Sequence, residues 1–536
     1  MSSRSIDVGR AVRTTRRRAV SVPAVLAAFV IGATVSAIAA PDHGSGQAAT
    51  VGTIGSSLGD AGGDAPSEAF DSGGTIPSGP TSAGGAPSAG GGGAITPSSP
   101  SSGGSSTGTP SGPSGASGGA AGSTANGGAT ARGVTATEIK IGVIDLDSSD
   151  LAPVCPRCGN GPSRNGGAEL GLVAAARASG LLPLNGRDIK MTFQITRVTS
   201  PESNRNACVA MAQQVKPFAV IIGPGVDVAG ACLAQEFKIP VIHAGGTANE
   251  SFLRQVYPYW IEVGQTPNRL LRNYAHWADA NGLLKGKKIG IYAPETDVGY
   301  EWAVDFKREL AKLGVTPAAE VRASGTQGLG STAASDAVAV QRFRAAGVDV
   351  AFLLTAMLGF QTSAQAQAYR PAYPMVDTGY NFTDAVTDIL MSPDATDGNL
   401  GYGPKFWSWS KRKPATARGN AAAQACIDAY SSYAKRTLDV FDNDAEIRYI
   451  FDVCSSTQIL LQGLQGAGPN LTEASFVNAI NRLGVVQTAL YTHTTFGPGR
   501  VGAGDVAATF KFSKARWQPE NNYWQAKSDW LPFTVP

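Results

Sequence analysis

The sequence predicts an α/β protein with two mainly parallel β-sheets, each flanked by helices. Short, continuous apolar runs such as Phe218–Ile222 and Ile239–Ile242 are typical of parallel strands that are covered on both faces. Segments with helical character alternate with these runs, as βα units require. After Tyr259–Val263 the alternation starts again, which indicates a second sheet.

The first series of units alternates strands and helices up to a turn of small residues. Its predicted elements are, in order, Ile139–Asp145, Asn165–Ser179, Ile189–Thr196, the helix that contains Cys208, Phe218–Ile222, the helix after Gly225, and Ile239–Ile242. The second series begins with a helix, because proline favours the first helical position. Its elements are Pro267–Ala280, Lys288–Tyr292, Gly299–Leu313, Ser335–Ala345, Val348–Leu354, Gln361–Tyr369 and Tyr373–Val376.

Three helical segments follow these units before the chain ends in a strand-like tail. They span Ala421–Lys435, Ile447–Leu464 and Ala474–Leu483, and the tail contains the sequences TFKF and YWQ.

Two turns of small residues follow neighbouring strands of the first series, at 223–225 and 244–247. Ligands of open α/β sheets bind at the carboxyl ends of the strands, where these turns lie. The first turn also leads into a helix, whose N-terminal amides can hold an anionic group. A dinucleotide fingerprint would need glycine where the chain has Val228, and the negative charge of Asp227 would oppose a pyrophosphate. The turns therefore predict a site for a small molecule other than a nucleotide.

The first forty residues indicate an export signal. Six arginines precede an uncharged apolar run, Ala19–Ala40, that ends in a small-x-small sequence at Ala37–Ala39. The run is also long enough to span a bilayer. The sequence is compatible with both a cleaved signal peptide and a retained signal-anchor, and it predicts an extracytoplasmic protein that is secreted or anchored at the cell surface.

Residues 41–132 are predicted to be a disordered linker. No charged or aromatic residue occurs from Ser72 to Ala131. Such a segment cannot bury enough apolar surface to offset the entropy lost on ordering. Its predicted role is to hold the folded body away from a membrane or cell wall, and glycosylation of its hydroxyl residues is a second possibility.

Charge and motif content exclude several classes of function. The chain carries a net charge of +3, of which the N-terminal arginines and Asp7 supply +5, so the remainder has no basic excess for nucleic acid. Its four histidines lie outside any H-E-x-x-H pattern, and no G-x-S-x-G occurs. His243 is expected to be a core histidine with satisfied hydrogen bonds. We therefore expect no enzyme, no metal and no cofactor.

Several motifs, in their order and spacing, resemble the leucine/isoleucine/valine-binding type of ABC-transporter solute-binding proteins. They are the opening GVTATEIKIG at 133–142, IIGP at 221–224, IPVI at 239–242, DVGY at 297–300 before a long helix, and the late helix pair with AG at 467–468 and LT at 471–472. The resemblance covers roughly residues 133–536.

This resemblance implies the type I periplasmic-binding fold, in which two lobes joined by three crossovers close on a ligand. The crossovers are expected near Gly264, Gly398 and Tyr491. The first lobe would then comprise residues 133–264 and about 399–490. The second lobe would comprise residues 265–398 and about 491–536.

Six cysteines in an exported protein favour three disulfides. Cys208 and Cys232 lie on two helices that flank one strand, and the resembled family often has a bridge there. Cys426 and Cys454 fall on two consecutive late helices. Cys155 and Cys158 are followed by a turn rather than a helix, which favours a local disulfide at the rim of the cleft over a redox site.

The resemblance also nominates ligand contacts. Thr247 matches the family's usual hydroxyl in the turn Ala244, Gly245, Gly246 and Thr247, whereas Asp227 replaces a common serine. An aspartate suits an ammonium, a hydroxyl-rich ligand or a neutral amide; alternatively, it only caps its helix.

Three further candidates come from the second lobe. Asp297 and Tyr300 flank the position at which the family often has an aromatic residue, and Tyr380 follows a predicted strand. Tyr300 could cover the ligand or simply pack on its lobe. The aromatic residues Tyr402, Phe406, Trp407 and Trp409 fit either a ligand pocket or core packing.

The function implied by the resemblance is capture of a small organic ligand, such as an amino acid, an amide or a related compound, for an ABC importer. The expected partners are that ligand and an importer permease, with membrane contact only through the N-terminal segment. A surface-anchored receptor on the same fold is one alternative. A thiol-dependent enzyme that uses Cys155 and Cys158 is another.

Overall fold

The structure is a computed structural model, and it describes residues 126–147, 166–197, 201–294, 297–323, 333–354, 360–376, 396–404, 409–410, 416–417, 420–438, 444–513, 524–526, 528 and 531–535. The predicted signal segment, nearly all of the predicted linker, Cys155, Cys158 and Tyr380 lie outside these residues. No helix in the described ranges is long and apolar enough to cross a membrane.

The first sheet is parallel throughout and has the strand order β2-β1-β3-β4-β5. Its strands are β1 (Glu138–Asp147), β2 (Asp188–Arg197), β3 (Ala219–Ile222), β4 (Val241–His243) and β5 (Trp260–Glu262). The predicted apolar runs thus form neighbouring strands, and their carboxyl ends meet at one edge of the sheet.

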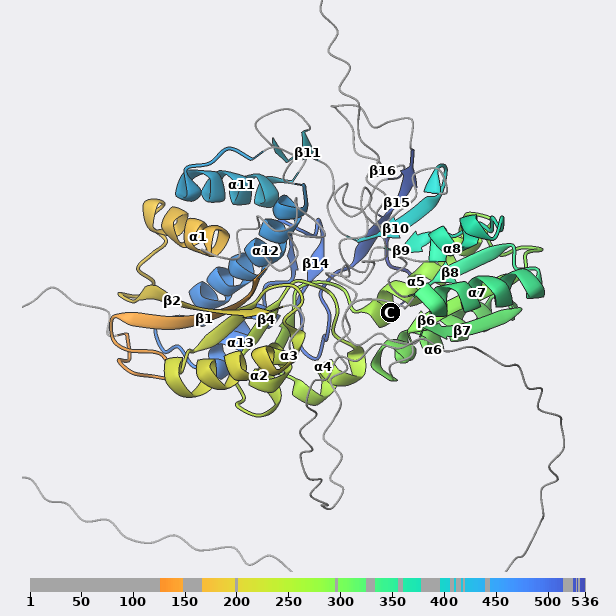
Figure 1. Ribbon diagram of the computed structural model, residues 1–536. Coiled ribbons are helices and arrows are strands. Elements are labelled where there is room, and N and C mark those ends of the chain that lie inside the picture. The colour runs from red at the N-terminus through yellow and green to blue at the C-terminus, as the bar shows by residue number, and fades with distance from the viewer. Residues whose placement is uncertain are drawn as a thin grey trace, which may run out of the picture. The chain divides into compact units, whose positions relative to one another are not determined.

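Helices cover both faces of this sheet (Figure 1). One face packs against α1 (Gly167–Ala178), α11 (Ala421–Ala434), α12 (Asp444–Ala467) and α13 (Glu473–Asn481). The opposite face packs against α2 (Pro201–Ala210), the π-helical turn η3 (Met211–Val215), α3 (Asp227–Gln235) and α4 (Glu250–Val256). Burial on both faces explains why β3 and β4 are apolar without alternation.

The second group of strands has a parallel core and a mixed extension, in which β9 pairs in parallel and the later strands pair antiparallel. In the order β7-β6-β8, the parallel strands are β7 (Ala319–Ala323), β6 (Ile289–Pro294) and β8 (Val350–Leu353). The extension has the order β9-β10-β15-β16 and comprises β9 (Met375–Val376), β10 (Leu400–Gly403), β15 (Val506–Phe512) and β16 (Trp524–Ala526). A bridge between Val350 and Ala372 connects the two parts.

The helices of this half are α5 (Pro267–Ala280), α6 (Asp297–Lys312), α7 (Ala333–Ala346) and α8 (Phe360–Ala366). Tyr402 stacks on Tyr274 and Trp277 of α5, with ring centroids 6.0 and 5.3 Å apart. Tyr402 is therefore a core residue. Phe406 and Trp407 lie outside the described residues, as does the side chain of Trp409.

The remaining strands are short, and each pairs with one other strand. They are β11 (Trp409–Ser410) with β12 (Thr416–Ala417), β13 (Val485–Val486) with β14 (Thr494–Thr495), and β17 (Leu531–Pro532), which pairs with β15.

The crossover that we expected near Gly398 lies later in the chain. Strand β10 pairs in parallel with β9 and antiparallel with β15, so the chain still belongs to the second sheet at Gly403. The next helix, α11, packs against the first sheet together with α1 and α12. The physical reason is that Leu400–Gly403 completes its hydrogen bonds with the C-terminal strand, a long-range pairing that leaves no local pattern.

The folded part of the chain also begins earlier than Gly133. The guanidinium of Arg187 is buried and donates to the carbonyl oxygens of Thr135, Gly128 and Pro469 at 2.8, 2.9 and 2.7 Å. The hydroxyl of Thr130 donates to the carbonyl of Leu471 at 2.5 Å. The last residues of the predicted linker are thus held against the first sheet and the loop before α13.

Candidate ligand-binding site

Buried polar side chains gather at the carboxyl ends of the first sheet's strands. They are Asp145, Glu169, Asp227, His243, Thr247, Glu262, Arg448 and Asp452, each less than 9% exposed. Polar groups buried in this number need partners, because an unpaired buried group destabilises the fold. How these groups are paired decides what the edge of the sheet can offer a ligand.

Asp227 and Thr247 lie together, although twenty residues separate them. The hydroxyl of Thr247 donates to Asp227 Oδ1 at 2.6 Å. Asp227 is the first residue of α3, and Val226 occupies the N-cap position, so Asp227 does not cap the helix in the way that the alternative interpretation assumed. The hydroxyl and the carboxylate that the sequence nominated therefore bind each other.

His243 connects Asp227 to Glu262. Its Nδ1 lies 2.9 Å from Glu262 Oε2, and its Nε2 lies 3.6 Å from Asp227 Oδ1. Burial opposes protonation of the ring, but the nearby charges of Glu262, Asp227 and Asp452 outweigh it and raise the pKa of His243 to about 9. Burial raises the pKa of Asp227, against the opposing effects of His243 and Thr247. At neutral pH His243 is therefore a cation between two carboxyl groups. It is buried, as expected of a core histidine, but its Nε2 has no hydrogen-bond partner among the described residues, so the expectation of satisfied hydrogen bonds holds only in part.

The carboxylate of Glu262 accepts several hydrogen bonds next to the turn Ala244–Thr247. Its Oε1 accepts from the backbone amides of Gly246 and Gly264 at 3.1 and 3.2 Å, and its Oε2 also accepts from the indole of Trp260 at 3.3 Å. Sequence reasoning missed Glu262, although a lone carboxylate in the apolar strand Tyr259–Val263 was an available signal. The carboxylate occupies amide donors that a ligand anion would otherwise use.

The rest of the turn is shaped by close packing. The hydroxyl of Tyr491 donates to the carbonyl of Ala244 at 2.6 Å. A Cβ added to Gly245 would lie 2.4 Å from His243 Nε2. Gly246 has φ of +72° and lies against the side-chain amide of Gln265. The small residues are thus required by the histidine and the glutamine behind them.

A second polar group lies on the other face of the sheet. The hydroxyl of Tyr449 in α12 donates to Oδ1 of Asp145 in β1. Burial raises the pKa of Asp145 to about 7, although the bond from Tyr449 opposes this. Burial, reinforced by the charge of Asp145, raises the pKa of Glu169 well above its usual range. In α12, Arg448 and Asp452 form a buried ion pair at 3.7 Å.

The second-lobe candidates lie apart from this edge or outside the described side chains. Asp297 is the first residue of α6, and its side chain is not described. The hydroxyl of Tyr300 donates to Glu320 Oε1 at 2.7 Å, and the guanidinium of Arg322 lies 3.5 Å from the ring centroid. Tyr300 therefore packs against β7 of its own sheet.

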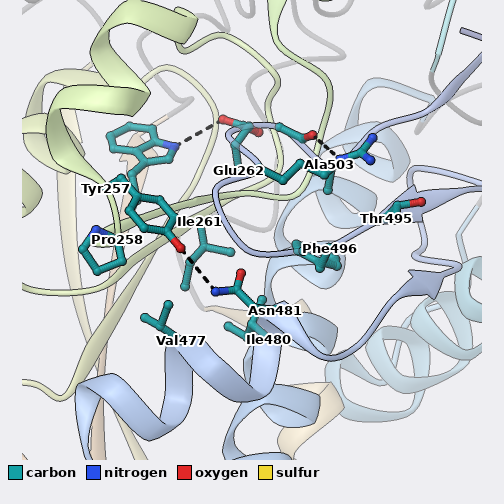
Figure 2. A pocket seen from close by; sticks show the side chains of 14 residues that line it. Tyr257, Pro258, Ile261, Glu262, Val477, Ile480, Asn481, Thr495, Phe496 and Ala503 are labelled. Atoms are coloured by element: carbon teal, nitrogen blue, oxygen red, sulfur yellow. Dashed lines mark hydrogen bonds between the residues drawn. The ribbon is translucent and has the colours of Figure 1, made fainter. Parts of the chain in front are cut away.

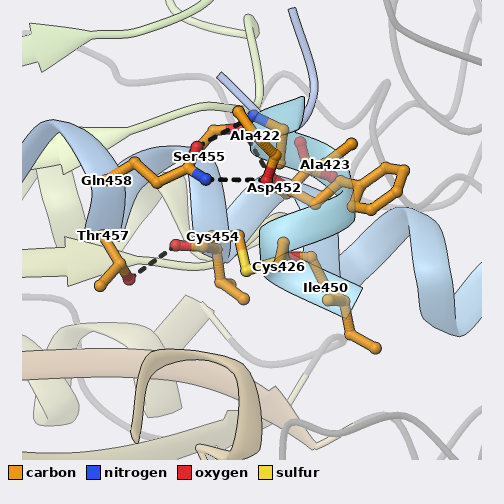
Figure 3. The surroundings of a disulfide bond; sticks show 12 residues. Ala422, Ala423, Cys426, Ile450, Asp452, Cys454, Ser455, Thr457 and Gln458 are labelled. Atoms are coloured by element: carbon orange, nitrogen blue, oxygen red, sulfur yellow. Dashed lines mark hydrogen bonds between the residues drawn. A yellow bond between two sulfur atoms is a disulfide. The ribbon is translucent and has the colours of Figure 1, made fainter. Parts of the chain in front are cut away.

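Two disulfides support the first sheet's helices. Cys208 in α2 is bonded to Cys232 in α3, and Cys426 in α11 to Cys454 in α12, each with Cα atoms 6.2 Å apart. Figure 3 shows the second bridge, beside which the amide of Gln458 donates to the carbonyl of Ala422 at 3.0 Å. Both pairs agree with those inferred from the sequence.

A recess lies beside the edge strand β5 (Figure 2). It is formed by β5, α13 and the segment 495–503, and the amide of Asn481 donates to the hydroxyl of Tyr257 at 3.4 Å across one wall. Glu262 lines this recess and also holds the turn at Gly246. The turn residues themselves do not line it. Within the described ranges, no group of three or more His, Cys, Asp or Glu side chains is arranged to hold a metal ion.

The chain matches the family model described as periplasmic binding protein over residues 138–518. A search of curated proteins gave no match.

Solved structures share the fold at low sequence identity. One is an ABC-transporter substrate-binding protein from Desulfitobacterium hafniense in complex with Leu, at 15% identity and TM-score 0.51, covering 73% of this chain and 99% of that one. Another is a possible leucine/isoleucine/valine-binding protein from Rhodopirellula baltica, at 14% identity and TM-score 0.51, covering 73% and 96%. A third is an ABC-transporter solute-binding protein from Rhodopseudomonas palustris in complex with p-hydroxybenzoic acid, at 13% identity and TM-score 0.54, covering 74% and 98%.

The parallel first sheet, the parallel core of the second group of strands and the family match over most of the body lead to one assignment: the chain belongs to the periplasmic binding protein family of the leucine/isoleucine/valine-binding type, with the type I periplasmic-binding fold.

Proposed function

We propose that this chain is an extracytoplasmic solute-binding protein that captures a small organic ligand between two lobes for an ABC importer. The observation that carries the proposal is the family match over residues 138–518. The proposed lobes follow the two groups of strands, so the first lobe begins at residue 133 or earlier and resumes after Gly403. A permease is the proposed partner, and delivery of a solute rather than catalysis is the proposed role.

The proposed ligand contacts lie at the carboxyl edge of the first sheet. Asp227, Thr247 and the small residues between His243 and Thr247 form the first-lobe surface, and Asp297 and Tyr380 are proposed for the second lobe. Tyr300 contributes by fixing β7 against α6, because its hydroxyl is bound to Glu320.

Two observations support the proposed ligand class: the ligands named for similar solved structures, and the hydrogen bonds at the carboxyl edge of the first sheet. The structures similar to this chain include one with Leu and one with p-hydroxybenzoic acid. In this chain, Gly246 N and the Thr247 hydroxyl already donate to Glu262 and Asp227. We therefore propose an amino acid, an amide or a related compound whose carboxylate, if it has one, is not held by these two donors.

A thermal-shift screen of the full chain tests this function. The panel comprises amino acids, amides, short carboxylates, polyols and aromatic acids. A ligand at about 100 times its Kd adds roughly 2.7 kcal/mol of apparent stability, which a shift in Tm detects. A hit that is weakened by Asp227→Asn or Thr247→Val supports the site. A hit that is unaffected by both variants places the ligand elsewhere, and silence across the panel contradicts the function.

A surface-anchored receptor is the second candidate, and the observation that favours it is the apolar run Ala19–Ala40 before a long linker. Mass spectrometry of the mature N-terminus separates the two candidates. A membrane-bound chain that retains residues 19–40 supports the receptor, whereas a chain that begins after Ala40 supports the importer component.

A further inference from the structure

Asp145 lies at the edge of the parallel sheet where a ligand is expected, but it is not among the ligand contacts proposed above. It is near the carboxyl end of β1, between β2 and β3. Its side chain faces the helices α1 and α12 and is fully buried. Asp145 is therefore a carboxyl group taken out of water at the edge that the proposed ligand would approach.

One oxygen of Asp145 is held in a fixed place. The hydroxyl of Tyr449 donates to Oδ1. The space for this pair depends on Gly223 in the turn after β3, because a Cβ there would lie 2.5 Å from Asp145 Oδ1 and 2.8 Å from the Tyr449 hydroxyl. Tyrosine and glycine together thus position the carboxyl group and leave its other oxygen, Oδ2, for a different partner.

That second oxygen has no hydrogen-bond partner among the described residues, and neither has Oε1 of the neighbouring buried Glu169. Folded proteins pair nearly all buried polar atoms, since each unpaired atom costs free energy. Asp145 in β1 and Glu169 in α1 therefore each have one buried carboxyl oxygen without a hydrogen-bond donor among the described residues. A ligand that brings N–H groups would supply such donors.

The neighbouring turn cannot supply those donors, because its own are engaged. Gly246 N donates to Glu262, and the Thr247 hydroxyl donates to Asp227. With Glu169 left out because its raised pKa favours the neutral form, the buried carboxyl groups Asp145, Asp227, Glu262 and Asp452 still outnumber the cations His243 and Arg448. The described part of the edge thus offers acceptors and negative charge, which attract a cation.

We propose that Asp145, positioned by Tyr449 and Gly223, binds a protonated amine or guanidinium group of the solute through its Oδ2. The inference rests on the proposed function and adds the charge class of the ligand to it. Burial and the charge of Asp145 raise the pKa of the neighbouring Glu169 well above its usual range, which favours its neutral form and limits the repulsion between the two acids. The cationic group is then the feature by which this chain selects its solute.

Matched probes test the charge class. Isothermal titration of the full chain at pH 8, where Asp145 is ionised, uses isopentylamine against 4-methylpentanoate and 4-hydroxybenzylamine against 4-hydroxybenzoate. Within each pair the carbon skeleton is similar and only the charged group changes sign. We expect binding by at least one amine and by neither carboxylate. In Asp145→Asn the affinity for that amine should fall about tenfold or more, as expected for a lost hydrogen bond to a charged group.

The ligand-free protein provides a test that needs no probe. Asparagine keeps the shape and can still accept from Tyr449, but it removes a buried charge. We therefore expect Asp145→Asn to melt at the same temperature as the wild type at pH 8, or higher, while it loses amine affinity. Asp428→Asn, an exposed carboxylate in α11, is the control and should change neither property.

The outcomes separate the inference from the function on which it rests. A carboxylate probe that binds wild type and Asp145→Asn equally leaves the proposed function standing and overturns the inference. A clear fall in the melting temperature of ligand-free Asp145→Asn would overturn it as well, because the carboxylate would then already be fully paired. If none of the four probes binds, the result counts against the function and the cationic ligand alike.

Discussion

His243 shows how much a single residue depends on contacts that are distant in sequence. The sequence presents it as an isolated histidine at the end of an apolar strand, which predicts a core residue with satisfied hydrogen bonds. The fold places Glu262 of the adjacent strand on one ring nitrogen and Asp227 of α3 near the other. A cation with two carboxyl neighbours results, and its charge contributes to stability only while the ring is protonated.

The stability contributed by His243 should disappear as the pH rises. Its pKa is about 9 in the folded protein and about 6.5 when unfolded. Because the folded pKa is the higher one, the contribution is complete below about pH 6.5 and is lost between there and about pH 9. We expect His243→Gln to lower the free energy of unfolding by roughly 3 kcal/mol more at pH 6 than at pH 10. Urea denaturation of both proteins at pH 6, 8 and 10 measures this difference.

Trp260→Phe is the matched control for this prediction. It removes a hydrogen bond to the same oxygen, Glu262 Oε2, without removing a titrating group. Its cost should stay constant over this pH range. If His243→Gln behaves in the same way, His243 is neutral in the folded protein and the assignment of its charge is wrong.

Those parts of the candidate site that depend on neighbouring residues in the sequence could be predicted, and those that depend on distant residues could not. The turn Ala244–Thr247 could be nominated because small residues follow an apolar strand, and Asp227 because the resembled family commonly has serine at that position. Glu262 and Asp145 could not be assigned roles, because their partners come from other strands and helices. Sequence spacing does not show which carboxyl groups share one edge of a sheet.

At the level of elements, helices and strands with a strong hydrophobic periodicity could be predicted from the sequence, whereas short or weakly patterned ones could not. The helix predicted at Pro267–Ala280 has those same bounds, and its first turn is capped by the side chain of Thr266, which accepts from the Arg269 amide. Strand β7, with the sequence AEVRA, and helix α4, only seven residues long, were missed. Both depend on packing against neighbours rather than on their own propensities.

The disulfide between α2 and α3 joins two elements on one face of the first sheet. Removal of Cys208–Cys232 in the double variant Cys208→Ala/Cys232→Ala should lower the free energy of unfolding by roughly 3 kcal/mol. The bridge closes a segment with a sequence separation of 24, and it limits the freedom of the unfolded chain. Urea denaturation of the variant and wild type under oxidising conditions measures the loss.

The double variant Cys426→Ala/Cys454→Ala is the comparison. Its sequence separation of 28 is similar, so its cost should be similar if loop closure determines the effect. Addition of a reducing agent should lower the stability of the wild type by more than that of a chain without both bridges, in which only Cys155 and Cys158 remain. A loss of less than about 1 kcal/mol for both pairs would contradict the expectation.

At the scale of the whole molecule, polar contacts connect the two halves beside the first crossover. Glu301 of α6 accepts from the amides of Asn249 and Asn268 at 3.0 and 2.9 Å and from the hydroxyl of Ser251 at 2.5 Å. The indole of Trp302 donates to Asn249. Asn249 and Ser251 belong to the first sheet's half, and Glu301 and Trp302 to the second. These bonds add to two others that link the halves beside them, in which the carboxylate of Glu250 accepts from the hydroxyl of Thr266 and from the guanidinium of Arg272 at 2.9 and 2.6 Å.

Glu301→Ala should consequently weaken the coupling between the halves more than it weakens either half. It leaves three donors without their acceptor, which costs about 2 kcal/mol in total if water replaces part of the loss. We expect calorimetry to show a broadened or divided unfolding transition, since each half retains its own core. Glu320→Ala is the matched control, because Glu320 also accepts from several donors, Tyr300 and Lys307, but within the second half alone. That control should shift the transition without broadening it. Transitions of the same shape in both variants would contradict the expectation, and would mean that the side chains around Glu301 add stability without cooperativity.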